Sequence, residues 1–155
     1  MNIILGASGR VGFGIVQKLL ELKQPLRAVV RSRHTLFHQV VDVKIADFFN
    51  PSQLKEALTG GSTVFLLTPE NPTSNDILGE TNQIIYNFNQ AIRQNGIKRI
   101  VGLSSVGAHL DAKSGNILMS RMLEQGFDDL DNEKIFIRPS YYFSNWLGYW
   151  ETIKL

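Results

Sequence analysis

The feature that most constrains the fold is a glycine-rich turn close to the first residue. Residues 1–5 are an apolar run typical of a strand, and a segment with the apolar spacing of a helix starts at Val11. Three glycines lie in this turn. In a strand–turn–helix unit they permit a tight turn, a close approach of the backbone to a pyrophosphate, and close packing of the helix on the sheet. The sequence therefore predicts a dinucleotide site here, formed by Gly6, Ala7, Ser8, Gly9, Arg10, Val11 and Gly12.

Composition narrows the class of protein. A chain of 155 residues with 43% hydrophobic and 19% charged residues fits one globular domain over 1–155. The net charge is +2 and basic residues form no cluster, so we expect no nucleic-acid partner. There is no cysteine, which excludes disulfides and thiol nucleophiles, and we expect no metal site. Apolar runs are too short to span a membrane, so a cytoplasmic location is expected.

Apolar runs alternate with helical spacing along the chain. They predict strands at 1–5, 26–30, 40–46, 63–67, 99–103 and 134–137. Helices are predicted over 11–20, 51–58, 77–95 and 117–123, and another is expected to start within 141–150. Five of the six strands, all except 40–46, are nearly continuous apolar runs, as in a parallel sheet covered on both faces. The fold predicted is α/β, a doubly wound parallel sheet of Rossmann type in three layers, with strand order 3-2-1-4-5-6.

The end of the second strand predicts which dinucleotide is preferred. In this fold an acid there binds the ribose hydroxyls of NAD, whereas an arginine accommodates the 2′-phosphate of NADP. The chain has Arg31 and Arg33 at this point, and the next acid is Asp42. Guanidinium groups pair well with phosphate, so NADP(H) is expected to be preferred over NAD(H). The alternative is that both arginines are solvated loop charges, and the same alternative holds for Arg10.

Polar residues follow the other strands where each strand ends. Asp47 and Phe48 should lie near the adenine, although Asp47 could instead cap the helix that follows. Because the carboxyl ends of parallel strands meet at one edge, the ribose and nicotinamide should lie against Thr68, Pro69, Ser104 and Ser105.

Taken together, Gly6–Gly12, Val30-Arg31, Asp47-Phe48, 65–69 and 137–139 resemble the NmrA-like family of atypical short-chain dehydrogenases/reductases. The most specific match is the run 138–146, which is similar to the family's Arg-Pro-x-x-(aromatic)-x-x-Asn segment. The resemblance covers essentially the whole chain and implies cofactor contacts at Leu67 and Pro139 as well. It is closest to the NADPH-dependent quinone oxidoreductases, and the family also includes regulatory proteins that bind NADP(H) or NAD without known turnover.

The chain departs from this family in two ways. Members run well beyond 155 residues, so the C-terminal substrate-binding part is expected to be absent or truncated here. Short-chain dehydrogenases generally use Tyr-x-x-x-Lys, in which the lysine lowers the pKa of the tyrosine. None of the four tyrosines, Tyr86, Tyr141, Tyr142 and Tyr149, is followed four residues later by lysine.

The missing pair favours an acceptor that needs little acid catalysis. A ketone develops a full alkoxide on hydride transfer, for which a positioned acid is worth about 10²–10⁴ in rate, whereas a quinone gives a delocalised anion. Weak catalytic candidates are Ser104, Ser105, His109, Lys113 and, less so, Arg121. Flat acceptors could stack on Tyr141, Tyr142, Phe143 and Trp146, which alternatively cover the sheet.

Three functions stay open at this point. The first is an NADPH-dependent reductase of quinones or related electrophiles. The second is a non-catalytic NAD(P)H sensor with a regulatory protein partner. The third, least favoured, is an epimerase or isomerase with tightly held cofactor.

Overall fold

The computed structural model describes residues 1–32, 37, 41–69, 71–110 and 114–153, and its centre is one six-stranded parallel sheet. The strand order is β3-β2-β1-β4-β5-β6, and each neighbouring pair is parallel. This confirms the predicted doubly wound sheet. The strands are β1 (Asn2–Leu5), β2 (Leu26–Val30), β3 (Asp42–Ile45), β4 (Thr63–Leu66), β5 (Arg99–Leu103) and β6 (Glu133–Ile137).

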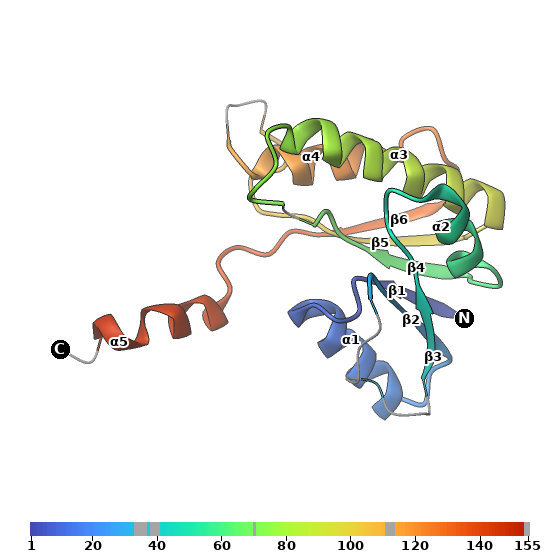
Figure 1. Ribbon diagram of the computed structural model, residues 1–155, viewed down its shortest axis with the longest axis horizontal. Helices are drawn as coiled ribbons and strands as arrows, with labels where there is room; N and C mark the ends of the chain where they lie inside the picture. Colours follow the sequence, from blue (N-terminus) through green and yellow to red (C-terminus); the bar gives the residue numbers. More distant parts are fainter. Residues whose placement is uncertain (33–36, 38–40, 70, 111–113, 154–155) are drawn as a thin grey trace.

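Helices lie on both faces of this sheet and complete three layers. Figure 1 shows α1 on one face and α2, α3 and α4 on the other. The bounds are α1 (Arg10–Glu21), α2 (Pro51–Leu58), α3 (Ile77–Asn95) and α4 (Ile117–Gln125). The predicted Rossmann-type architecture is therefore confirmed.

Local signals in the sequence set several helix ends. Asn50 is the N-cap of α2, where its side-chain oxygen accepts a hydrogen bond from the Gln53 N–H at 3.1 Å, and Pro51 follows at the first helical position. Asp76 caps α3 in the same way, with Gly79 as the donor at 2.9 Å. Gly96 ends α3 with φ +60°, a left-handed conformation that glycine adopts without strain.

The core is divided between the two faces of the sheet. Because successive side chains of a strand point to opposite faces, Ile3 and Leu5 pack with α2, α3 and α4, while Ile4 packs with α1. On the first face the largest buried side chains are Phe88 and Phe127. The two cores hold β1 at the centre of the molecule, so the turn that follows β1 is rigidly placed.

The edge strands differ from the prediction. β6 was expected to be an apolar run buried on both faces, but Ile135 and Ile137 are 42% and 51% exposed. Phe136, between them, packs against the core beneath α4. Strand β3 is shorter than the predicted 40–46, and Val43 and Ile45 are also exposed. An edge strand can be covered on one face alone, and its sequence then alternates in exposure.

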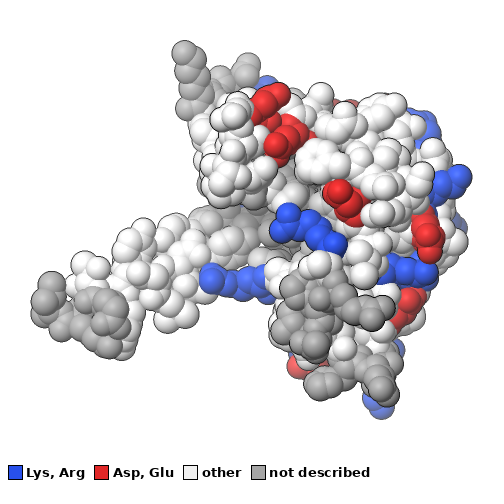
Figure 2. All heavy atoms as spheres, viewed as in Figure 1, with Lys and Arg blue, Asp and Glu red and all other residues white. Residues whose placement is uncertain are grey.

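The segment after β6 leaves the body of the molecule. It forms a 3₁₀ helix, η1 (Phe143–Tyr149), and then the short α5 (Trp150–Ile153), which Figure 1 shows projecting away from the sheet. Residues 139–150 carry no charge, and they appear as a white projection in Figure 2, whereas acidic and basic side chains are mixed over the body on that face. The predicted helix start is thus confirmed, although its first turns are 3₁₀ rather than α.

The topology opens a crevice between β1 and β4. Chain connections from β1 pass over the α1 face, whereas those from β4 pass over the α3 face (Figure 1). The loops at the carboxyl ends of these two strands therefore diverge, and in open α/β sheets ligands bind at this point.

Candidate functional site

The glycine turn after β1 is built around one backbone conformation that needs glycine. Gly6 has φ +67°, which side-chain-bearing residues rarely adopt. The turn is fixed by a hydrogen bond from the Ala7 N–H to the carbonyl of Val29 at 3.1 Å, and by one from the Gly9 N–H to the carbonyl of Gly6 at 3.0 Å. Ala7 is fully buried, so the turn is anchored in the core.

The other two glycines serve packing and access. A Cβ on Gly12 would lie 2.3 Å from the carbonyl oxygen of Gly6, so only glycine allows α1 to pack this closely on the turn. A Cβ on Gly9 would meet only that same oxygen at 3.3 Å, and Gly9 is exposed. Gly12 is therefore required by the fold, whereas Gly9 keeps the surface of the turn open.

The first turn of α1 has features that favour an anion. Gly9 is the N-cap and has no side chain to accept hydrogen bonds from the amides that follow it. The N–H groups at the start of a helix and the positive end of its dipole favour a phosphate. The turn for which the sequence predicts pyrophosphate binding thus leads directly into a helix N-terminus.

The turn opens onto a cavity of about 380 Å³. Arg31, the residue directly after β2, lines this cavity and is exposed to solvent. Phe48 is 3% exposed and packs edge-on against Phe88, with ring centroids 5.1 Å apart. The residues that line this first cavity are Gly6, Ser8, Gly9, Arg31, Phe48, Leu67 and Pro69.

Asp47 lies beside this cavity and takes part in a local turn. One oxygen of its exposed carboxylate accepts a hydrogen bond from the Phe49 N–H at 3.0 Å. The alternative of a helix cap does not apply, because Asn50 caps α2. Arg33, the second predicted arginine, lies outside the described residues.

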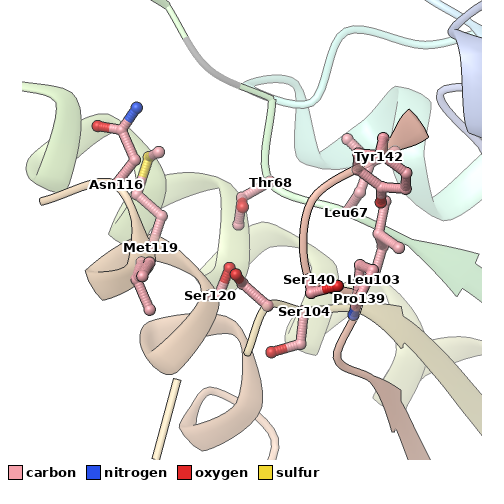
Figure 3. Close-up of a pocket in the computed structure, with 12 residues that line it drawn as sticks. Leu67, Thr68, Leu103, Ser104, Asn116, Met119, Ser120, Pro139, Ser140 and Tyr142 are labelled. Carbon is pink, nitrogen blue, oxygen red and sulfur yellow. The ribbon is translucent and has the colours of Figure 1, made fainter. Parts of the chain in front are cut away.

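A second cavity of about 240 Å³ adjoins the first at the carboxyl ends of β4 and β5. Leu67 lines both cavities, so the two are neighbours at the crevice. Figure 3 shows that its walls come from the loop after β4, from α4, and from the segments after β5 and β6. The described residues that line it are uncharged: Leu67, Thr68, Leu103, Ser104, Ser105, Asn116, Ile117, Met119, Ser120, Pro139, Ser140 and Tyr142.

Ser104 is the most firmly held polar residue of this second cavity. It is 6% exposed, and its N–H extends the sheet by donating to the carbonyl of Ile137 at 2.8 Å. Its hydroxyl donates to Oε1 of Glu124 on α4 at 2.5 Å. Arg138 donates two hydrogen bonds to the same carboxylate, from Nε to Oε1 at 2.8 Å and from a terminal nitrogen to Oε2 at 2.5 Å.

This arrangement keeps Glu124 ionised. The hydrogen bond from Arg138 is the largest effect and lowers the pKa of the Glu124 carboxyl below its usual value; burial opposes it, and the Ser104 hydroxyl adds to it. Bidentate guanidinium–carboxylate pairs have a fixed geometry. Ser104 is therefore oriented from three elements, β5, β6 and α4.

Tyr142 provides the second cavity with a phenol. Burial raises the pKa of Tyr142, so the hydroxyl is protonated and can donate a hydrogen bond at neutral pH. The two aromatic neighbours predicted with it lie elsewhere. Tyr141 packs edge-on against Trp146 with ring centroids 5.9 Å apart, and Phe143 is 90% exposed.

The other predicted site residues that the structure describes do not line either cavity. The Arg10 guanidinium donates to Ser144 Oγ at 2.8 Å and so ties α1 to the segment after β6. Val11 packs in the α1 core. His109 is exposed, and Lys113 lies outside the described residues. Arg121 donates to the carbonyl of Leu110 at 2.7 Å.

Several cavity residues were not foreseen from the sequence. Asn116, Ser120 and Glu124 lie four residues apart, a spacing that places side chains on one face of a helix. That spacing was a usable signal for the two that line the cavity, Asn116 and Ser120. The pairing of Glu124 with Arg138 had no such signal, because it depends on how α4 packs beside β6.

Two negative findings apply to the part of the chain that the structure describes. It brings together no group of three or more His, Asp or Glu side chains able to hold a metal ion. Nor, within the same residues, is there a helix with the length and apolar character needed to cross a membrane.

Comparison with known proteins agrees with this geometry. Residues 6–140 match a family described as NAD(P)H-binding. A curated relative, the NAD(P)H azoreductase of Xenophilus azovorans, is 26% identical over 160 residues, which cover 99% of this chain and 52% of that protein.

Solved structures share the fold. Triphenylmethane reductase of Citrobacter sp., complexed with NADP(H), has a TM-score of 0.84 at 22% identity, covering 99% of this chain and 55% of that one. An NADPH-dependent quinone oxidoreductase of Escherichia coli, complexed with NADPH, has a TM-score of 0.82 at 22% identity, covering 98% and 53%. The chain therefore spans about half the length of the relatives it matches.

Proposed function

Since the chain belongs to the NAD(P)H-binding family, we propose that it is an NADPH-dependent reductase of quinones or related conjugated electrophiles. The observation that carries the proposal is the pair of neighbouring cavities that share Leu67 as a lining residue. A dinucleotide can lie across this residue, with its adenosine half against the glycine turn and its nicotinamide half against the ends of β4 and β5. When bound, the reduced nicotinamide supplies a hydride to the acceptor.

The preference for NADPH rests on Arg31. Arg31 lines the first cavity with residues of the glycine turn, at the end of β2 where the adenosine ribose lies in this fold. A 2′-phosphate there can accept charge-assisted hydrogen bonds from Arg31, and the exposed position leaves the guanidinium accessible. Phe48 and Pro69 line the same cavity and offer apolar surface to the adenine.

The acceptor class rests on the lining of the second cavity. Among the residues that the structure describes, this lining offers hydroxyls and an amide but no carboxylate, ammonium or guanidinium. Such a lining suits an uncharged acceptor and gives weak acid catalysis. A quinone needs little, because its reduced product is stabilised by delocalisation, and Tyr142 can donate a hydrogen bond to a carbonyl oxygen. The names of the relatives, an azoreductase, a triphenylmethane reductase and a quinone oxidoreductase, support the same class of acceptor.

The experiment is NADPH oxidation followed by absorbance with a benzoquinone, with a simple aldehyde, and without acceptor. We expect oxidation with the quinone to exceed that with the aldehyde. Gly9→Val should abolish it, because the added side chain occupies the open surface where the pyrophosphate approaches. Gly14→Ala is the matched control, since a Cβ at Gly14 meets nothing within 4 Å, and it should keep full activity.

Two results would contradict the proposal. Equal rates with quinone and aldehyde would remove the argument from the uncharged cavity. Tight NADPH binding without turnover of any acceptor would favour a cofactor-sensing protein over an enzyme.

A further inference from the structure

The hydroxyl of Ser104 has one hydrogen and can donate only one hydrogen bond, which it already makes within the protein. It donates to Oε1 of Glu124 at 2.5 Å. Arg138 holds both oxygens of that carboxylate and lowers the pKa of Glu124, so the group is ionised and can only accept. The Ser104 proton must therefore point towards α4, away from any acceptor in the cavity.

The same arrangement leaves the lone pairs of Ser104 available. A serine hydroxyl has one hydrogen and two acceptor sites. Ser104 is 6% exposed and lines the second cavity, so an acceptor site on its oxygen is the part that can meet a ligand. A buried acceptor of this kind is favourable when a ligand N–H or O–H reaches it and costly when nothing does.

We infer that Ser104 accepts a hydrogen bond from the nicotinamide riboside half of the bound dinucleotide, with Glu124 and Arg138 as the residues that position it. The donor is an N–H of the carboxamide or a hydroxyl of the ribose, the two donors that this half of the cofactor carries. The inference rests on the proposed function, because it needs the nicotinamide half in the second cavity. It agrees with the cofactor contact expected for Ser104 from the sequence, and not with the weaker expectation that Ser104 is catalytic.

A comparison within the molecule separates this role from plain stabilisation. Arg99 and Glu133 form an ion pair between the first residues of β5 and β6, at the end of these strands opposite to Ser104 and Arg138. The distance from Arg99 Nε to Glu133 Oε2 is 2.7 Å. Both side chains are about half exposed, and neither lines the second cavity. Glu133→Gln is therefore the matched control for Glu124→Gln.

The test measures dissociation constants by titration calorimetry on the folded wild-type chain and its variants. The ligands are NADPH, its 3-acetylpyridine analogue, which lacks the carboxamide N–H, and 2′,5′-ADP, which lacks the whole nicotinamide riboside. Ser104→Ala should weaken the binding of NADPH by about 2- to 12-fold, the range for one neutral hydrogen bond, and leave the affinity for 2′,5′-ADP unchanged. Glu124→Gln should also weaken the binding of NADPH, and the loss of affinity in the double variant should be smaller than the sum of the two single losses. Glu133→Gln should leave the affinities for both ligands unchanged.

The analogue identifies the donor. If the carboxamide donates, Ser104→Ala should leave the affinity for the acetylpyridine analogue unchanged. If a ribose hydroxyl donates, Ser104→Ala should weaken the binding of the analogue as much as the binding of NADPH. Either result supports the inference.

Three outcomes overturn the inference. Two leave the proposed function standing: unchanged NADPH affinity in Ser104→Ala, or an equal loss for NADPH and 2′,5′-ADP, which indicates general disruption. A wild-type chain that binds neither ligand overturns the proposed function and the inference together.

Discussion

Two glycines in the same helix should respond in opposite directions to the same substitution. Gly12 and Gly14 both lie in α1, two residues apart. A Cβ on Gly12 would stand 2.3 Å from the Gly6 carbonyl oxygen, 2.9 Å from its carbon and 3.0 Å from Ala7 Cα, all backbone atoms. A Cβ on Gly14 meets nothing within 4 Å. Gly12→Ala should therefore destabilise the fold and Gly14→Ala should stabilise it.

The size of the difference follows from these contacts. Alanine in place of glycine inside a helix raises the free energy of unfolding by about 0.5–1 kcal/mol, and this gain applies to both variants. At Gly12 the Cβ and the Gly6 oxygen must separate by about 1 Å to reach an ordinary contact near 3.4 Å. Overpacking of this kind costs about 1–3 kcal/mol, and a rigid backbone neighbour favours the upper end. The free energies of unfolding of the two variants should thus differ by about 2–3 kcal/mol.

The assay is urea or thermal unfolding followed by circular dichroism on the wild-type chain and both variants. For a chain of this size the expected difference corresponds to roughly 4–12 °C in Tm between them, with the wild type in between. Equal stabilities of Gly12→Ala and Gly14→Ala would refute the reasoning, because the close approach of α1 to the turn would then carry no constraint.

Three further predictions follow from single contacts. Asn50→Ala should lower the free energy of unfolding by about 0.5–2 kcal/mol, since it removes the cap that accepts from Gln53; no change in urea unfolding would contradict this. The pKa of Glu124 is lowered in the fold chiefly by Arg138, so its carboxylate adds stability above its unfolded pKa of about 4.3, and this is lost as pH falls through the folded pKa. The stability gap between wild type and Glu124→Gln should therefore close in acid, whereas a gap independent of pH would refute the assignment. Tyr142→Phe should lower kcat/KM for a quinone by about 2- to 12-fold with the Kd for NADPH unchanged, and an altered Kd would instead place Tyr142 against the cofactor.

The fold was predictable because its signals are local. The glycine turn, the alternation of strands and helices, and caps such as Pro51 and Gly96 can each be recognised within a few residues. They sufficed for the strand order and for the family, both of which are confirmed. The exposure of Ile135 and Ile137 was not predictable in this way, because an apolar run does not tell which face of an edge strand is covered.

The candidate site was predictable only in part, and the division has a physical reason. The sequence could place Gly6, Ser8, Gly9 and Arg31 at one cavity, because topology alone brings the ends of β1 and β2 to the crevice. The link from Ser104 through Glu124 to Arg138 was missed, because it joins a strand end, a helix and a second strand end through side chains. Such a contact depends on the packing angle of α4, which no local pattern encodes.

The central claim is that the crevice binds NADP(H) through Arg31 and the glycine turn. Titration calorimetry with NADPH and NADH on the wild-type chain and on Arg31→Ala tests it most directly. The account predicts tighter binding of NADPH by the wild-type chain, and a loss of about 1.5–3 kcal/mol for NADPH in Arg31→Ala with NADH affinity unchanged. Equal affinities of the wild-type chain for the two cofactors, or a preference that survives in Arg31→Ala, would contradict it.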